Sequence, residues 1–65
     1  MQFITLIDVL DKTALTYSTL NRLINNRQFP DKVHLGGTLY LWDRHEVDDW
    51  MEQRMLERTK MTVTF

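Results

Sequence analysis

The sequence predicts a small α+β fold with about three helices and a two-stranded β-hairpin. Three patterns in its 65 residues support this prediction. Thr5 and Thr16 each precede apolar residues at helical spacing. The pair Gly36-Gly37 lies between two runs of residues that are typical of strands. The segment Asp43-Arg44-His45-Glu46 has the spacing of a helix capping box.

The composition limits what can stabilise so short a chain. A domain of this size buries only about 60% of the surface that its unfolded chain exposes. The chain has no cysteine and only two histidines, so neither a disulfide nor a structural zinc site is expected. We therefore expect the aromatic and methionine side chains to form the core.

The sequence carries no sign of a membrane segment. No apolar run approaches the length of a membrane span, and the N-terminus lacks the basic start of a signal peptide. The absence of cysteine fits a reducing compartment. These features predict one soluble, cytoplasmic domain that does not engage a membrane.

The first two expected helices are short and close together in the sequence. Thr5 can cap the first helix with Asp8 in the capping-box position, and this helix should end near Lys12. Thr16 should cap the second helix, which should end near Asn26 because the following Phe-Pro pair disfavours helical backbone. Two helices joined by about four residues have helix-turn-helix spacing. Any helical hairpin of a small bundle shows the same pattern, so both interpretations remain open at this point.

Residues 31–42 should form the hairpin, with Gly36-Gly37 as a two-residue loop. Such a loop favours glycine because both of its central residues must adopt a positive φ. Closing the turn there pairs Leu35 with Thr38 and Val33 with Tyr40. The predicted core face then carries Val33, Leu35, Tyr40 and Trp42. The opposite face carries His34, Leu39 and Leu41.

The last expected helix spans residues 44–58, with Asp43 as its cap and Glu46 reaching back to complete a capping box. The acids in its first turns suit the positive end of the helix dipole. We expect residues 59–65 to be a frayed C-terminal tail, so that residues 1–58 make up the folded domain.

The exposed face of the second helix indicates contact with nucleic acid. It carries no acid, and its polar residues are Tyr17, Ser18, Asn21, Arg22 and Asn25. Hydroxyl, amide and guanidinium groups bond to base edges and phosphate oxygens. The net charge is −1, but residues 12–40 carry four cations and one acid, whereas residues 43–52 carry five acids and one cation. This pattern predicts a recognition helix, although ordinary solvated charge is the alternative.

The sequence shows no catalytic pattern. It lacks a nucleophile with a nearby base, a metal-ligand spacing and a phosphate-cradling glycine loop. Asp48 and Asp49 are neighbours on the expected helix, so their carboxylates diverge and cannot work as a pair. We therefore expect no enzymatic activity, no cofactor and no metal.

The order of these features resembles that of a known family. The matching positions are Leu6, Asp8-Val9, Thr13-Ala14-Leu15-Thr16, Ser18-Thr19-Leu20, Arg22-Leu23-Ile24, Phe29-Pro30, Val33, Leu35-Gly36, Trp42, Glu46-Val47 and Trp50. Over about residues 5–55, this run closely resembles the AlpA family of phage and genomic-island regulators. These are MerR-like winged helix-turn-helix proteins, related in fold to phage excisionases. The resemblance implies a second helix in the major groove of double-stranded DNA and a hairpin wing at the adjacent backbone or minor groove.

The resemblance also implies roles for individual residues. The base-reading candidates are Tyr17, Ser18, Asn21 and Arg22. The nearby phosphate contacts would be Thr16, Thr19, Arg27 and Lys32, with His34, Gly36, Gly37 and Thr38 from the wing. Family members regulate integrase genes, act as recombination directionality factors that help a tyrosine integrase excise the element, or do both. Cooperative self-association on repeated DNA sites is a further expectation from the family.

The chain departs from the family pattern in two places. Tyr17 stands where the family usually has arginine or lysine, and Thr38-Leu39-Tyr40 stands where basic residues usually follow the wing glycines. We therefore expect weak single-site binding that relies on adjacent protomers or a partner. A competing interpretation is a protein-interaction module, such as an antirepressor or integrase-binding factor without its own DNA site. The negative net charge, the acidic last helix and the expected exposure of Leu39 and Leu41 favour this alternative.

Overall fold

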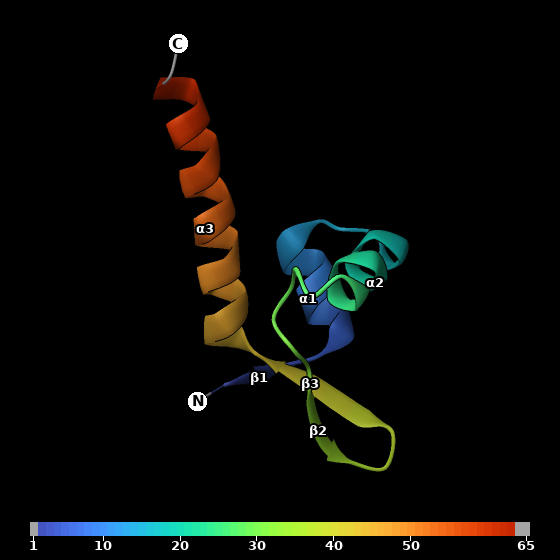
Figure 1. Ribbon diagram of the computed structural model, residues 1–65. Helices are drawn as coiled ribbons and strands as arrows, with labels where there is room; N and C mark the ends of the chain where they lie inside the picture. Colours follow the sequence, from blue (N-terminus) through green and yellow to red (C-terminus); the bar gives the residue numbers. More distant parts are fainter. Residues whose placement is uncertain (1, 64–65) are drawn as a thin grey trace.

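The computed structural model describes the backbone of residues 2–63 and the side chains of residues 2–57. Within this part of the chain there are three helices and three strands (Figure 1). In chain order they are β1 (Phe3–Ile4), α1 (Leu6–Thr13), α2 (Tyr17–Asn25), β2 (Val33–Gly36), β3 (Leu39–Asp43) and α3 (Arg44–Val63). The α+β class, the helices and the hairpin are confirmed, and the arrangement is consistent with a winged helix-turn-helix.

The three strands form one antiparallel sheet in the order β1-β3-β2. β1 pairs with β3 through Phe3 opposite Asp43 and Ile4 opposite Trp42. Only a two-stranded hairpin was predicted from the sequence, so β1 adds a third strand to it. The Gln2 carbonyl also accepts from the Arg44 N–H at 2.8 Å. The start of the chain is thereby fixed to the start of α3.

The first two helices begin as predicted. Thr5 and Asp8 form the capping box, in which each side chain accepts from the backbone N–H of the other at 3.2 Å. The Thr16 hydroxyl accepts from the Thr19 N–H at 3.2 Å. These bonds satisfy amides that have no partner inside a helix. The local sequence therefore determines where α1 and α2 start.

The register of the hairpin differs from the predicted one. The turn residues are Gly37 and Thr38, and Gly36 pairs with Leu39. His34 pairs with Tyr40 and Val33 with Leu41, which leaves Leu35 as the extra residue of a β-bulge. The predicted pairs, Leu35 with Thr38 and Val33 with Tyr40, are therefore wrong. Gly36 has a φ of 141° and Gly37 a φ of 53°. Both glycines are thus needed, although only Gly37 lies at a central turn position.

The shifted register changes which side chains face the helices. Trp42 is buried as predicted, but Leu35 is 49% exposed and Tyr40 is 41% exposed. The prediction that Leu35 and Tyr40 belong to the core is therefore wrong. Cross-strand partners share a face of the sheet, so His34 lies on the same face as Tyr40 rather than on the opposite one.

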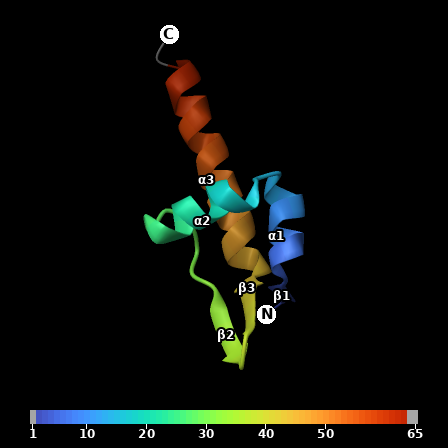
Figure 2. The same ribbon diagram turned by 90° about the vertical axis from the view of Figure 1, so that its right-hand side faces the viewer.

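α3 is longer than predicted, since it runs from Arg44 to Val63 rather than ending near Arg58. Its distal half extends beyond the rest of the domain (Figure 2). The Asp43 carboxylate accepts from the His45 N–H at 3.2 Å, which is a shorter-range cap than the expected capping box. Residues 64–65 lie outside the described residues, so the division into a 1–58 domain and a frayed tail stays a prediction. Among the described residues, no helix combines the length and apolarity that crossing a membrane requires.

The core lies between the three helices and one face of the sheet. Its buried side chains are Val9, Leu20, Phe29, Trp42 and Val47. Phe29 meets Trp50 edge to face, with ring centroids 4.8 Å apart. The indole N–H of Trp42 donates to the Pro30 carbonyl at 3.2 Å, and that of Trp50 donates to the Gln28 carbonyl at 2.7 Å. Both tryptophans, which the sequence predicted to be packing residues, thus hold the segment between α2 and β2.

An ion pair links α1 to α3 at the surface. Lys12 Nζ lies 2.7 Å from an Asp48 carboxylate oxygen, and Arg44 Nε lies 3.7 Å from the other oxygen. The hydrogen bond from Lys12 is the largest cause that lowers the pKa of Asp48 below its usual 3.8, followed by the positive charges around it. A carboxylate whose pKa falls on folding stabilises the folded state above its unfolded pKa. That stabilisation is lost as the pH falls through the lowered value.

We expect Asp48→Asn to make the stability of the domain less dependent on acid pH. Unfolding by urea at about pH 5 should show the wild type to be more stable than the variant. The difference should shrink as the pH falls through the lowered pKa of Asp48, because the carboxylate then becomes protonated in both folded and unfolded wild type. In a Lys12→Met background the same substitution should have a smaller pH-dependent effect. A stability difference that is unchanged across this range would contradict the assigned role of the ion pair.

Candidate DNA-binding face

The side chains of α2 divide between the core and an exposed polar face. Leu20 is buried, and Leu23 and Ile24 pack against the core. The four predicted base-reading residues, Tyr17, Ser18, Asn21 and Arg22, are all exposed. They project from the side of the helix opposite its apolar stripe, as helical periodicity requires. The structure thus brings these four predicted residues together on one accessible surface.

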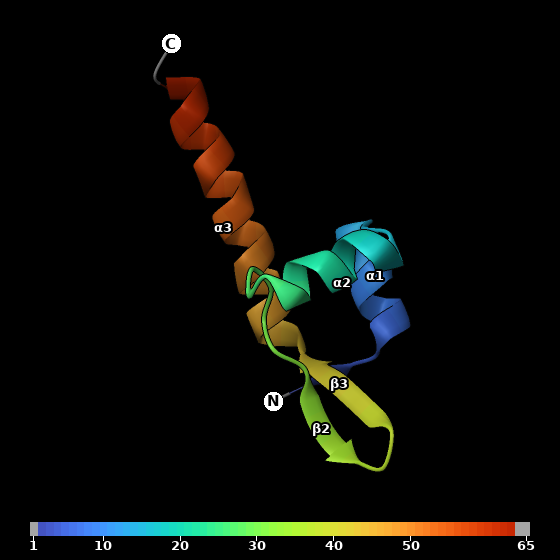
Figure 3. The same cartoon turned by 45° about the vertical axis from the view of Figure 1, so that its right-hand side comes forward.

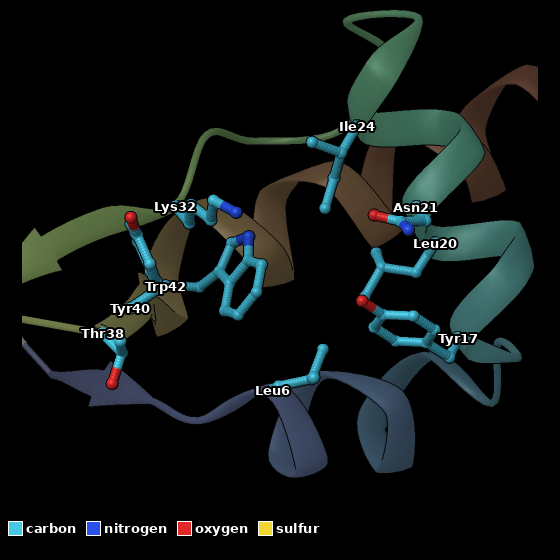
Figure 4. A pocket seen from close by; sticks show the side chains of 9 residues that line it. All are labelled: Leu6, Tyr17, Leu20, Asn21, Ile24, Lys32, Thr38, Tyr40 and Trp42. Atoms are coloured by element: carbon cyan, nitrogen blue, oxygen red, sulfur yellow. The ribbon is translucent and has the colours of Figure 1, made fainter.

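A groove separates this polar face from the hairpin (Figure 4). Tyr17 and Asn21 line it from α2, and Thr38 and Tyr40 line it from the hairpin. The remaining lining residues are Leu6, Leu20, Ile24, Lys32 and Trp42. None of these nine side chains is acidic, and Lys32 supplies a cation. The groove can therefore accept an anionic, hydrogen-bonding ligand without repelling it.

The hairpin wall of the groove is held by contacts around Tyr40. The Lys32 ammonium lies 4.5 Å from the centre of the Tyr40 ring. The His34 ring stacks on Tyr40 with centroids 4.8 Å apart, and its Nε2 donates to the Gly37 carbonyl at 2.7 Å. These contacts connect the base of the hairpin to its turn. They make the hairpin a stiffer element than an isolated pair of strands would be.

The far end of α2 is closed by a Schellman motif. The Gln28 N–H donates to the Leu23 carbonyl at 2.8 Å, and the Arg27 N–H donates to the Ile24 carbonyl at 3.1 Å. Arg27 occupies the left-handed position with a φ of 57°, where glycine is usual. Its exposed side chain lies beyond the last residue of α2, Asn25. Arg27 is therefore at the end of the polar face and does not line the groove.

Comparisons with known proteins identify the family. Residues 2–55 match the family model described as Prophage CP4-57 regulatory protein (AlpA). The chain belongs to the AlpA family. It is also 34% identical over 59 residues to a protein of Enterobacteria phage P4, described as "Uncharacterized protein ORF88". That match covers 91% of this chain and 67% of the phage P4 protein. No solved structure matches the chain significantly.

Membership in the AlpA family points to a phage regulatory protein of the DNA-binding kind, and not to a family of enzymes. The helix-turn-helix interpretation of α1 and α2 fits this family better than a generic helical hairpin does. Within the described residues, no three side chains that commonly bind metals come together. The candidate DNA-binding surface consists of the polar face of α2 together with the groove and the hairpin.

Several of the predicted phosphate-contact residues of the AlpA chain already make contacts within the protein. Thr16 and Thr19 hydrogen bond to each other through their hydroxyls at 2.9 Å, and Thr19 is half-buried. Their first role is therefore to cap α2. His34 is exposed, but its Nε2 is already used inside the hairpin. Gly36 and Gly37 have open space where a side chain would lie, since a Cβ added at either would meet no atom within 4 Å.

One residue of the groove was missed by reasoning from the sequence. Tyr40 was assigned to the core, whereas it lines the groove and carries the contacts of Lys32 and His34. Tyr40 lies two residues from Trp42 on β3 and shares the predicted face with it, but Tyr40 is nearer the hairpin tip, outside the buried core, and is 41% exposed. The presence of a tyrosine at this position, with a polar tip suited to a wet surface, was the available signal.

Among the described residues of this AlpA chain, two that are not glycine adopt left-handed backbone, Ala14 after α1 and Arg27 after α2. Such a conformation destabilises a non-glycine residue by roughly 1–2 kcal/mol. Glycine avoids this strain, but it loses more conformational entropy on folding, which offsets about 0.5–1 kcal/mol of the gain. We therefore expect Ala14→Gly and Arg27→Gly each to raise the free energy of unfolding by about 0.5–1 kcal/mol.

Urea denaturation of the purified variants would test this expectation. The matched control is Gln53→Gly, at an exposed position inside α3, which should lower the free energy of unfolding by about 1 kcal/mol. A decrease in stability for Ala14→Gly or Arg27→Gly would show that the left-handed backbone does not strain these two residues.

Proposed function

We propose that this AlpA-family chain binds double-stranded DNA sequence-specifically, with α2 in the major groove and the hairpin at the adjacent backbone or minor groove. The observation that carries the proposal is the acid-free groove between the polar face of α2 and the hairpin. In Figure 3 the two elements lie at the same end of the domain, while α3 extends away from them. One DNA duplex could therefore contact both elements.

Base reading is assigned to the exposed residues of α2. Arg22 can donate two hydrogen bonds to the O6 and N7 of guanine, and Asn21 can bond to adenine in the same bidentate way. Ser18 and Tyr17 carry hydroxyl groups that bond to base edges or phosphates with less selectivity. Arg22 is therefore the side chain expected to contribute most to discrimination between sites.

Phosphate contacts are assigned to residues around this reading surface. Lys32 at the hairpin base and Arg27 beyond the end of α2 provide positive charge on two sides of the polar face. Thr38 can donate a hydroxyl from the turn, and Gly36 and Gly37 carry no side chain that would keep a phosphate from the backbone there. Thr16 and Thr19 remain as candidate contacts beside their capping role. Few of these groups are charged, which supports weak binding by one protomer.

The biological role proposed is that of a recombination directionality factor, a transcriptional regulator, or both, in a prophage or genomic island. Neither role needs a catalytic group in this chain. A directionality factor shapes attachment-site DNA so that a tyrosine integrase can excise the element. A regulator occupies a promoter. Because binding by one protomer should be weak, we expect adjacent protomers on repeated sites or an integrase partner to supply the remaining affinity.

Replacing Arg22 with alanine should weaken binding to the cognate site by about 1–3 kcal/mol, because a bidentate contact to a base is lost. Binding to unrelated DNA should change much less. The matched control is Arg54→Ala on α3, whose guanidinium pairs with Glu57 and lies outside the groove. The measurement is a gel-shift titration on specific and unrelated duplexes. If the Arg22 variant binds the cognate site as tightly as the wild type does, α2 is not the recognition helix.

A footprint titrated with salt should distinguish the biological roles. The DNA to use is that flanking the gene for this chain and any neighbouring integrase gene. With about 3–5 phosphate contacts, the slope of log affinity against log salt should lie near −3 to −4.5 for one protomer. A slope steeper than about −7 would contradict so few contacts. Protected repeats near an attachment site would support a directionality factor, and protection over a promoter alone would support a regulator.

The second candidate is a protein-interaction module, and the exposed Leu39 is the observation that favours it. Leu41, the other residue expected to be exposed, is half-buried. A complete lack of footprint at low salt would reject DNA binding and favour this candidate.

A further inference from the structure

The tip of the hairpin presents two leucines to solvent. Gly36 and Leu39 form the last strand pair before the turn, and the bulge places Leu35 beside that pair. Leu35 is 49% exposed and Leu39 is 52% exposed. The tip projects beyond the helices of the domain (Figure 1). An apolar end on a protruding hairpin has no packing role within the described part of the chain.

The hairpin tip lacks the charge that would bind phosphate. No lysine or arginine occurs from residue 33 to residue 43. The Lys32 ammonium sits over the Tyr40 ring at the base of the hairpin, and His34 Nε2 bonds to the Gly37 carbonyl. The tip therefore has no charged side chain that is available for an electrostatic contact with the DNA backbone. If the tip meets DNA, its leucines must contribute through apolar contact.

The hairpin is rigid, and its tip is narrow enough to enter a groove of DNA. The stack of His34 on Tyr40 and the bond from His34 to Gly37 brace the turn against the strands. The indole N–H bond from Trp42 to the Pro30 carbonyl fixes the hairpin to the segment from α2. At the turn, Gly36 and Gly37 have only open space where side chains would be. A braced, narrow tip loses little freedom on entering a groove.

We propose that Leu39, supported by Leu35, is a wedge that enters the minor groove beside the α2 site, partly unstacks one base step and bends the DNA. Apolar side chains inserted in this way bend duplexes by about 20–90°. The proposal rests on the proposed function, because α2 must lie in the adjacent major groove. Thr38 and Tyr40 line the groove opposite α2, so the turn lies next to the reading face.

A protein partner fits the two leucines less well. A standard protein interface covers about 800 Å² on each side, which is far more than two half-exposed leucine side chains provide. The sheet has two other exposed large hydrophobic residues, of which Tyr40 is already in contact with His34 and Lys32. The second, Phe3, lies opposite Asp43 at the far end of β3. It is roughly 13 Å from Leu39 along the strand, so it does not extend the patch at the tip. A wedge needs only one or two apolar side chains.

The test compares the full chain with Leu35→Ala/Leu39→Ala and with Leu56→Ala, a control of the same residue type that is 47% exposed on α3. The probe is a duplex selected by the wild-type chain from a random library. Bending is measured by circularly permuted gel shifts, and unstacking is measured by the reactivity of thymines toward permanganate. Urea denaturation confirms that each variant remains folded.

We expect the wild type and Leu56→Ala to bend the duplex and to expose a thymine to permanganate at one edge of the footprint. The double alanine variant should keep the same footprint but lose most of the bend and the reactivity. Equal bending and reactivity in all three proteins would overturn the wedge while leaving DNA binding intact. A wild type that binds without bending would also overturn it. A failure of the library to yield any bound duplex would reject both the wedge and the proposed function.

Discussion

The relative placement of α2 and the hairpin depends on two indole N–H groups. Trp42 and Trp50 donate to the carbonyls of Pro30 and Gln28, in the segment that leads from one element to the other. Phe29, between these two carbonyls, is buried against Trp50. The backbone N–H and C=O groups of a segment without helix or strand need other hydrogen-bond partners when side chains bury the segment. In a chain of 65 residues with no disulfide, these bonds are a main reason why the groove has a defined shape.

The starts of α1 and α2 were predicted correctly from the sequence because they depend on neighbouring residues. The caps at Thr5 and Thr16 need only a side chain and an amide three residues away, and both formed as expected. The hairpin register depends instead on how the strands meet the rest of the sheet. A bulge at Leu35 cannot be recognised from alternation alone, because the Gly-Gly pair is compatible with turns at two adjacent positions. Strand β1 has only two residues, which is too short for a periodic signal.

The difference between local and long-range contacts also explains which parts of the candidate site were predicted from the sequence. The four predicted reading residues share a helix face, so helical spacing was enough to group them. The groove also needed the hairpin, and the assignment of Tyr40 to the core hid the role of this residue at the groove. The αL conformation of Arg27 was equally invisible in the sequence, since glycine or asparagine is the usual signal for it. Long-range pairing decided the position of the hairpin, whereas the backbone conformation of Arg27 depends on the hydrogen bonds that close α2.

The distribution of charge shows how a chain with a net charge of −1 can still offer DNA an acceptable surface. At the start of α3, Asp48 is neutralised by Lys12 of α1, whereas Lys32 remains beside the acid-free groove. One cation thus holds two helices together while another lines the proposed interface. With so few cations, the long-range attraction to phosphate is weak. Shape and hydrogen bonding must then supply much of the recognition, and these depend on the braced geometry of α2 and the hairpin.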